Sequence, residues 1–296
     1  MTTTDKGREP TRSRVKVADG VELSVITSGL DGPLTPVLMV HGLASNARLW
    51  DGVAAALSDT GHPVAAVDQR GHGHSSKPDH GYDFETVTAD LVALIDQLGW
   101  SDRPPMVAGQ SWGGNVVLDL AANRPGSVSA ITLVDGGTIE LSARFADWPT
   151  AESAMAPPVL LGTPHQQFEE MLRRYHPDWP ESGIVGSLAN MEVLDDGTIR
   201  PWLSRENHMR ILYHLWEHRP RQLYPLIQVP VLMLMADARS NPRWMAGKRQ
   251  EVTAAQAALV AATIEWIEGD HDLHAQYPDK VAGLIHQATE GNFNPA

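Results

Sequence analysis

The sequence predicts an α/β fold: a mostly parallel eight-stranded sheet with helices on both faces and an inserted helical lid. Short runs rich in Val, Ile and Leu alternate with segments whose apolar residues recur at helical spacing, as in parallel sheets covered on both faces. This alternation stops after Val134 and resumes at Val231. The stretch between is rich in Pro and Trp and has no strand-length apolar run. We therefore expect a core of residues 1–137 and 221–296 and a helical lid of residues 138–220.

The eight strand candidates are short apolar runs bounded by turn residues. They lie at residues 15–17, 21–27, 37–40, 64–67, 106–108, 130–134, 231–235 and 263–267. Between the fourth and fifth runs, Phe84, Val87, Leu91 and Leu94 recur at helical spacing and predict an amphipathic helix. A second helical pattern begins just after Ser111.

The composition of the chain argues against several classes of function. The formal charge of -13 argues against a nucleic-acid partner, because such binding depends on clustered Lys and Arg. No segment reaches the roughly 20 apolar residues of a membrane span, and the polar start of the chain predicts no signal peptide, so the default location is cytoplasmic. With no cysteine, a thiol nucleophile and disulfides are excluded. A homodimer is compatible with the sequence.

The strongest local signal is Gly109-Gln110-Ser111-Trp112-Gly113, a G-x-S-x-G motif between an apolar run and a helical pattern. That context is the one in which the motif forms a tight turn that exposes a nucleophilic serine. The glycines leave room for close backbone packing. The helix start also places unpaired N–H groups near Ser111, where negative charge would develop.

Several motifs together resemble the α/β-hydrolase superfamily. They are Val40-His41-Gly42, Trp50, the stretch from Asp68 to Ser75, the serine turn and a histidine near the C-terminus, in the order typical of that family. The resemblance covers roughly residues 37–278. It implies the α/β-hydrolase fold, Ser111 as nucleophile, and an oxyanion hole formed by the backbone N–H groups of Leu43 and Trp112. His41 is expected to be structural, with its imidazole bonded to nearby backbone.

The resemblance also implies a base on the loop after the last strand. His271 fits best, with Gly269 before it and Pro278 after it, and His274 is the competitor. The third member of the triad is a carboxylate that orients the histidine. Most family members carry it after the seventh strand, where this chain has Arg239.

Two carboxylates remain as candidates for the acid. Asp237 follows the seventh strand directly and would need a shifted loop. Asp135, at the end of the sixth strand and followed by two glycines, occupies the place where zearalenone lactonases and one branch of haloalkane dehalogenases carry their acid. We prefer Asp135 and keep Asp237 as the alternative.

These residues predict a carboxylic ester hydrolase that works through an acyl-enzyme on Ser111. The four tryptophans and several methionines of residues 138–220, among them Trp179 and Met209, favour a small apolar ester or lactone as substrate. Carbon–carbon bond hydrolysis, thioester hydrolysis and cofactor-free haloperoxidase activity use the same catalytic triad and are alternatives. A ligand-binding receptor on a hydrolase scaffold is the alternative from another class. A serine rather than an aspartate at the turn argues against dehalogenase and epoxide hydrolase chemistry.

No cofactor and no metal are expected. His72 and His74 lie on a glycine loop without a carboxylate cluster, and His214 and His218 share a helix face without a third ligand. No glycine-rich nucleotide loop follows a strand.

Overall fold

The computed structural model describes residues 9–238 and 242–291 and confirms the predicted sheet. Its eight strands run in the order β1-β2-β4-β3-β5-β6-β9-β10. Strand β2 is antiparallel to both β1 and β4, and the remaining neighbours are parallel. The strands span β1 Thr11–Ala18, β2 Val21–Ser28, β3 Val37–Val40, β4 Val64–Asp68, β5 Met106–Gln110, β6 Ala130–Val134, β9 Val231–Asp237 and β10 Ala262–Glu268.

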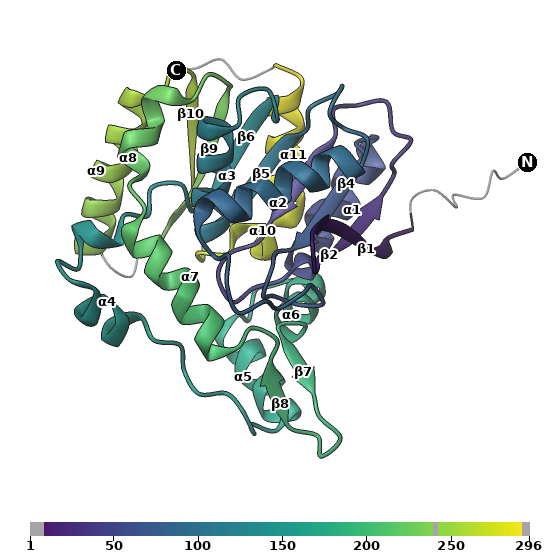
Figure 1. The fold of residues 1–296 in the computed structure, drawn as a ribbon, viewed down its shortest axis with the longest axis vertical. Helices are drawn as coiled ribbons and strands as arrows, with labels where there is room; N and C mark the ends of the chain where they lie inside the picture. The colour runs from purple at the N-terminus through teal and green to yellow at the C-terminus, as the bar shows by residue number, and fades with distance from the viewer. Residues whose placement is uncertain (1–8, 239–241, 292–296) are drawn as a thin grey trace, which may run out of the picture.

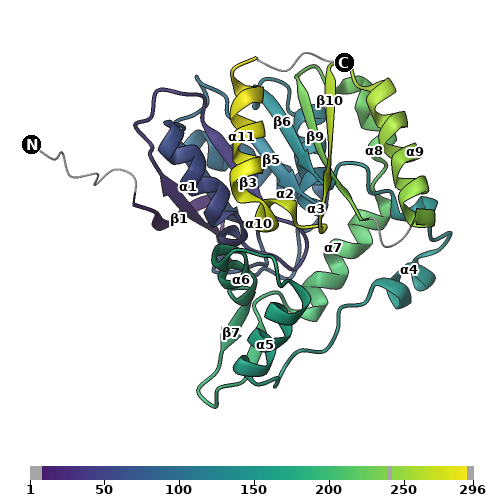
Figure 2. The same ribbon diagram turned by 180° about the vertical axis from the view of Figure 1, so that it is seen from behind.

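Helices cover both faces of the sheet (Figures 1 and 2). One face carries α2 (Phe84–Gln97), α3 (Trp112–Asn123) and α9 (Pro242–Ala258), and the other carries α1 (Asp51–Thr60), α10 (Leu273–Gln276) and α11 (Pro278–Thr289). Central strands β3, β4, β5 and β6 are buried along their whole length. Burial on both faces explains why the sequence shows them as unbroken apolar runs rather than as alternating patterns.

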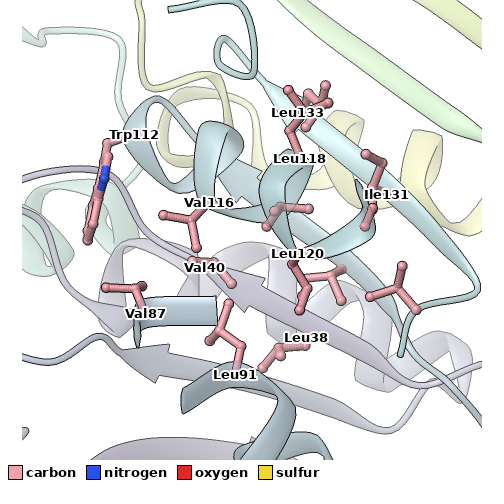
Figure 3. Close-up of a cluster of buried hydrophobic side chains, with 14 of the residues drawn as sticks. Leu38, Val40, Val87, Leu91, Trp112, Val116, Leu118, Leu120, Ile131 and Leu133 are labelled. Carbon is pink, nitrogen blue, oxygen red and sulfur yellow. The ribbon is translucent and has the colours of Figure 1, made fainter. Parts of the chain in front are cut away.

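The larger core cluster lies between the sheet and the α2–α3 layer (Figure 3). Leu91 of α2 and Val116 and Leu120 of α3 pack in this cluster together with Leu38 and Ile131 of the sheet. All five side chains are at most 1% exposed. Helix α3 is thereby held rigidly on the strands whose ends surround Ser111.

Most of the segment between β6 and β9 lies beyond the carboxyl ends of the parallel strands, and its last part runs back beside the sheet to the start of β9 (Figure 1). It contains α4 Trp148–Met155, α5 His165–Tyr175, α6 Glu181–Leu188, the hairpin β7 Met191–Val193 and β8 Ile199–Pro201, α7 Arg205–Glu217 and α8 Pro220–Leu223. Three short 3-10 helices complete the described elements, Ala47–Trp50, Leu141–Ala143 and Tyr224–Leu226. The hairpin was not predicted, since neither of its three-residue strands is an apolar run. Along the described parts of the chain, no helix combines the length and apolarity needed to cross a membrane.

Candidate active site

Ser111 lies on a strained turn between β5 and α3. Its backbone has φ 54° and ψ −121°, a conformation that costs a non-glycine residue of order 1–3 kcal/mol. The flanking glycines make the turn possible. A Cβ on Gly109 would lie 2.3 Å from the carbonyl oxygen of Gly113, and one on Gly113 would lie 2.4 Å from that of His41. The sequence motif thus forms the sharp strand-to-helix turn that it predicted.

The turn is fastened to the end of β6. The Ser111 N–H donates to the carbonyl of Val134 at 3.0 Å. A Cβ on Gly136 would come within 2.3 Å of the Ser111 carbonyl oxygen, so only glycine permits this contact. The same contact places Asp135, which also has a positive φ of 45°, beside the serine turn.

The structure brings Asp135, not Asp237, to His271. Asp135 Oδ2 lies 2.6 Å from His271 Nδ1, and Asp135 Oδ1 accepts a hydrogen bond from the Ala236 N–H at 3.0 Å. Asp237 pairs with Arg249 at 2.7 Å instead. Arg239, which stands where the family resemblance implied a carboxylate, lies outside the described residues.

Burial and neighbouring charges shift the pKa values of Asp135 and His271. Burial alone would raise the pKa of Asp135, but the hydrogen bond from His271 and the positive charges of His271 and Lys248 outweigh it, so its pKa lies below the ordinary value. Burial alone would lower the pKa of His271, but the bond to Asp135 and the negative charge of Asp272 raise it overall. An ionised acid next to a basic imidazole is the combination that general-base catalysis requires.

Sequence reasoning missed Lys248 of α9, whose ammonium contacts Asp135 Oδ1. The lysine side chain is only 7% exposed. No motif marks it, because its proximity to Asp135 follows from the packing of α9 and not from any spacing along the chain.

Two buried imidazoles hold the loop that carries Leu43. His41 Nε2 accepts from the Gln69 N–H at 3.0 Å, so its Nδ1 carries the proton that is donated to the Gly42 carbonyl at 2.7 Å. His72 Nε2 likewise accepts from the Ala44 N–H at 3.2 Å. Burial lowers the pKa of both histidines and keeps them neutral. His41 therefore contacts the backbone as expected.

Within the described residues, the N–H groups of Leu43 and Trp112 have no hydrogen-bond acceptor. Leu43 lines the same pocket as Ser111, while the Trp112 side chain is 2% exposed and stacks on His72 with ring centroids 5.6 Å apart. Of Trp112, it is therefore the backbone amide at the start of α3, and not the indole ring, that lies beside the serine.

Ser111 and His271 line one pocket of about 270 Å³ beneath the inserted segment. Its apolar wall includes Leu43, Leu49, Phe168, Leu172 and Trp179, and its polar wall includes Ser45, Ser187 and Asn190. Of the tryptophans and methionines that favoured an apolar substrate, Trp179 is the one that lines this pocket. The lining is thus more polar than the composition of residues 138–220 predicted.

The inserted segment is tied to the loop that carries His271. Asp270 Oδ2 lies 3.1 Å from His176 Nδ1 and accepts from the Trp179 indole at 3.0 Å. Gln276 Nε2 donates to the carboxylate of Asp178 and Gln276 Oε1 accepts from the Asp270 N–H at 2.6 Å. One side of the pocket is therefore fixed to the histidine loop.

The other candidate histidines have separate environments. His274 is fully buried against Trp50, with ring centroids 4.3 Å apart. His74 packs on Trp202, His214 pairs with Glu217, and His218 lies 3.3 Å from Asp119. In residues 9–238 and 242–291 no group of three or more His, Asp or Glu side chains could hold a metal ion.

Comparison with known proteins gives the class of this fold. A family model described as alpha/beta hydrolase fold matches residues 35–178. The structure of E-2-(acetamidomethylene)succinate hydrolase superposes with a TM-score of 0.78 at 22% identity, over 96% of this chain and 100% of that one. These findings show that the chain has the α/β-hydrolase fold, and they agree with the resemblance drawn from its motifs.

Curated relatives match over part of their length. The chain is 38% identical to Epoxide hydrolase A of Mycobacterium tuberculosis over 125 residues, which are 40% of this chain and 38% of that protein. It is 29% identical to Rhodomycin D methylesterase DnrP of Streptomyces peucetius over 176 residues, 53% of this chain and 58% of the relative. The relatives thus include hydrolases of different substrate classes, and the matches span about 40–60% of their length.

Proposed function

We propose that this α/β hydrolase is a serine esterase that cleaves a small ester or lactone through an acyl-enzyme on Ser111. His271 would take the serine proton, and Asp135 would orient the imidazole and stabilise its protonated form. The observation that carries the proposal is the 2.6 Å contact of Asp135 with His271 at the pocket that Ser111 also lines. No cofactor is needed for this chemistry.

The proposed steps balance within the site. Ser111 Oγ would attack the substrate carbonyl carbon while its proton passes to His271 Nε2, because Nδ1 is engaged by Asp135. The oxyanion would receive the Leu43 and Trp112 N–H groups, and such preorganised donors are worth about 2.7–4 kcal/mol each. The imidazolium would then protonate the leaving alcohol, and a water deprotonated by the same histidine would release the acid.

The polar wall of the pocket points to a substrate with a second oxygen acceptor. Asn46 Oδ1 accepts from the Arg48 N–H at 2.8 Å and its Nδ2 donates to the Gly186 carbonyl at 2.8 Å, so backbone groups fix its orientation. The same Nδ2 donates to Asn190 Oδ1 at 2.5 Å. Asn190 must therefore turn its own NH2 group elsewhere. We propose that this NH2 group, in a wall of the pocket, binds a carbonyl or hydroxyl oxygen of the substrate.

Pre-steady-state hydrolysis of p-nitrophenyl acetate tests the proposal. An acyl-enzyme predicts a burst of nitrophenolate stoichiometric with the enzyme, followed by slower turnover. Ser111→Ala and His271→Ala should lose the burst. His80→Ala should keep it, because its ring, paired with Asp79, is 84% exposed. Absence of both burst and turnover in the wild-type protein would refute the esterase and favour the ligand-binding alternative.

A further inference from the structure

The carboxylate of Asp135 is contacted on both of its oxygens. His271 Nδ1 engages Oδ2, while Oδ1 receives the Ala236 N–H and the Lys248 ammonium. The side chain of Asp135 is 3% exposed. A buried ionised carboxylate is costly unless charges and donors compensate it. Lys248 supplies a positive charge on the side away from the imidazole.

Lys248 is itself held in place by three kinds of contact. Besides Asp135, its Nζ donates to the Ala236 carbonyl at 2.6 Å. The same atom lies 4.9 Å from the ring centroid of Trp244 and 5.9 Å from that of Trp266, within or near the range of cation–π attraction. The ammonium therefore has partners on several sides and a fixed position.

We propose that Lys248 is a positioning residue of the catalytic triad, which holds Asp135 ionised and aimed at His271. The inference rests on the proposed function of this site. The backbone of Ala236 connects the two side chains, since its N–H donates to Asp135 and its carbonyl accepts from Lys248. Aspartate, lysine and the end of β9 thus form one rigid unit behind the imidazole.

The lysine also sets how readily the Asp135–His271 pair takes up a proton. A nearby positive charge disfavours an added proton whichever atom of the pair carries it. Other charged or titratable groups act on the imidazole from its own loop and from the packed elements; they are Asp272, Asp135, His274 and Lys248. Asp270 and His176, which contact each other, act on the neighbouring Asp272. Of these groups, Lys248 carries an ammonium charge. Removing that charge should move proton uptake by the Asp135–His271 pair to higher pH.

The chain offers a matched control one residue away. Arg249, also in α9, pairs with Asp237 at 2.7 Å and lies 4.3 Å from the ring centroid of Trp266. Arg249→Met removes a cation that has an ion pair and an aromatic contact, as does Lys248→Met. The two variants differ in the carboxylate that loses its partner, which is Asp135 in Lys248→Met and Asp237 in Arg249→Met.

Two readouts test the proposal. Long-range 15N–1H correlations of labelled histidine, assigned with His271→Gln, follow protonation of the imidazole without any substrate. Hydrolysis of p-nitrophenyl acetate gives the acid limb of the kcat/KM profile. In Lys248→Met both should move to higher pH, and kcat/KM at neutral pH should fall about tenfold to hundredfold, as expected for a loosened catalytic group. Arg249→Met should titrate and turn over as the wild type does.

Charge-retaining and donor-retaining variants keep the test decisive. In Lys248→Arg, the His271 imidazole should titrate as in the wild type. In Lys248→Gln, which keeps a hydrogen-bond donor but no charge, the imidazole titration should move to higher pH. This second neutral variant serves if Lys248→Met fails to fold. An unshifted imidazole in the neutral variants, a shift in Lys248→Arg, or an equal shift in Arg249→Met would overturn the proposal. Because the imidazole titration needs no turnover, a wild-type protein without esterase activity would refute the proposed function separately.

Discussion

Replacing Asp135 by asparagine should reverse the hydrogen-bonding polarity at His271. The Ala236 N–H and the Lys248 ammonium both donate to the Oδ1 side, so the amide oxygen of the new side chain would face them. Its NH2 group would then point to His271 Nδ1, which must accept instead of donate. The imidazole would carry its proton on Nε2 and could no longer take the proton of Ser111.

The same tautomer change in a serine protease triad lowers kcat about 10⁴-fold, which corresponds to about 5.5 kcal/mol of barrier. We therefore expect Asp135→Asn to lose about four orders of magnitude in kcat for p-nitrophenyl acetate and to keep its folded structure. Asp237→Asn is the matched control and should stay within about threefold of the wild type, because its carboxylate pairs with Arg249. Collapse of activity in Asp237→Asn, or near-normal activity in Asp135→Asn, would refute the assignment of the acid.

Three further predictions concern the turn, the base and the core. Gly136→Ala should destabilise the protein by about 1–3 kcal/mol in urea unfolding, because the new Cβ meets the Ser111 carbonyl oxygen at 2.3 Å. The kcat/KM profile should lose activity as pH falls through a His271 pKa above its usual 6.5, since the protonated ring cannot act as base; a limb well below 6.5 would contradict this. Arg70→Met should cost about 3–5 kcal/mol of unfolding free energy, because it strands Asp90, whose buried carboxylate lies 2.6 Å from the arginine.

The sheet could be predicted because its strands are buried. Val37–Val40 and Ala130–Val134 have no exposed residue, so each appears in the sequence as an unbroken apolar run. The outer strand β1, by contrast, extends beyond its predicted residues 15–17 to Thr11–Ala18. Its first four residues, Thr11, Arg12, Ser13 and Arg14, are all exposed and carry no apolar signal.

The site was predictable where a local backbone requirement marks it. The glycines around Ser111 reflect close contacts that exclude a Cβ, and those contacts lie within a few residues or at one strand end. The choice between Asp135 and Asp237 could not be made in this way. It depends on which carboxylate β6 and β9 direct toward the loop of His271, and this follows from strand order and backbone strain.

The positions of Lys248 and of the polar pocket residues could not be predicted from the sequence. Lys248 is one of several basic residues in α9, and its burial next to Asp135 is a property of tertiary packing. Asn190 follows α6 and precedes the hairpin β7–β8, where no chemical motif singles it out. The aromatic and methionine content of residues 138–220 described the inserted segment as a whole, not the few side chains that reach the pocket.

Labelling with a fluorophosphonate probe tests whether Ser111 is a nucleophile activated by His271. We expect a single adduct on Ser111, located by mass spectrometry of the intact protein and its peptides. The adduct should be absent in Ser111→Ala and should form far more slowly in His271→Ala. If the wild-type protein forms no adduct, or if His271→Ala reacts as fast as the wild type, Ser111 is not a nucleophile activated by His271.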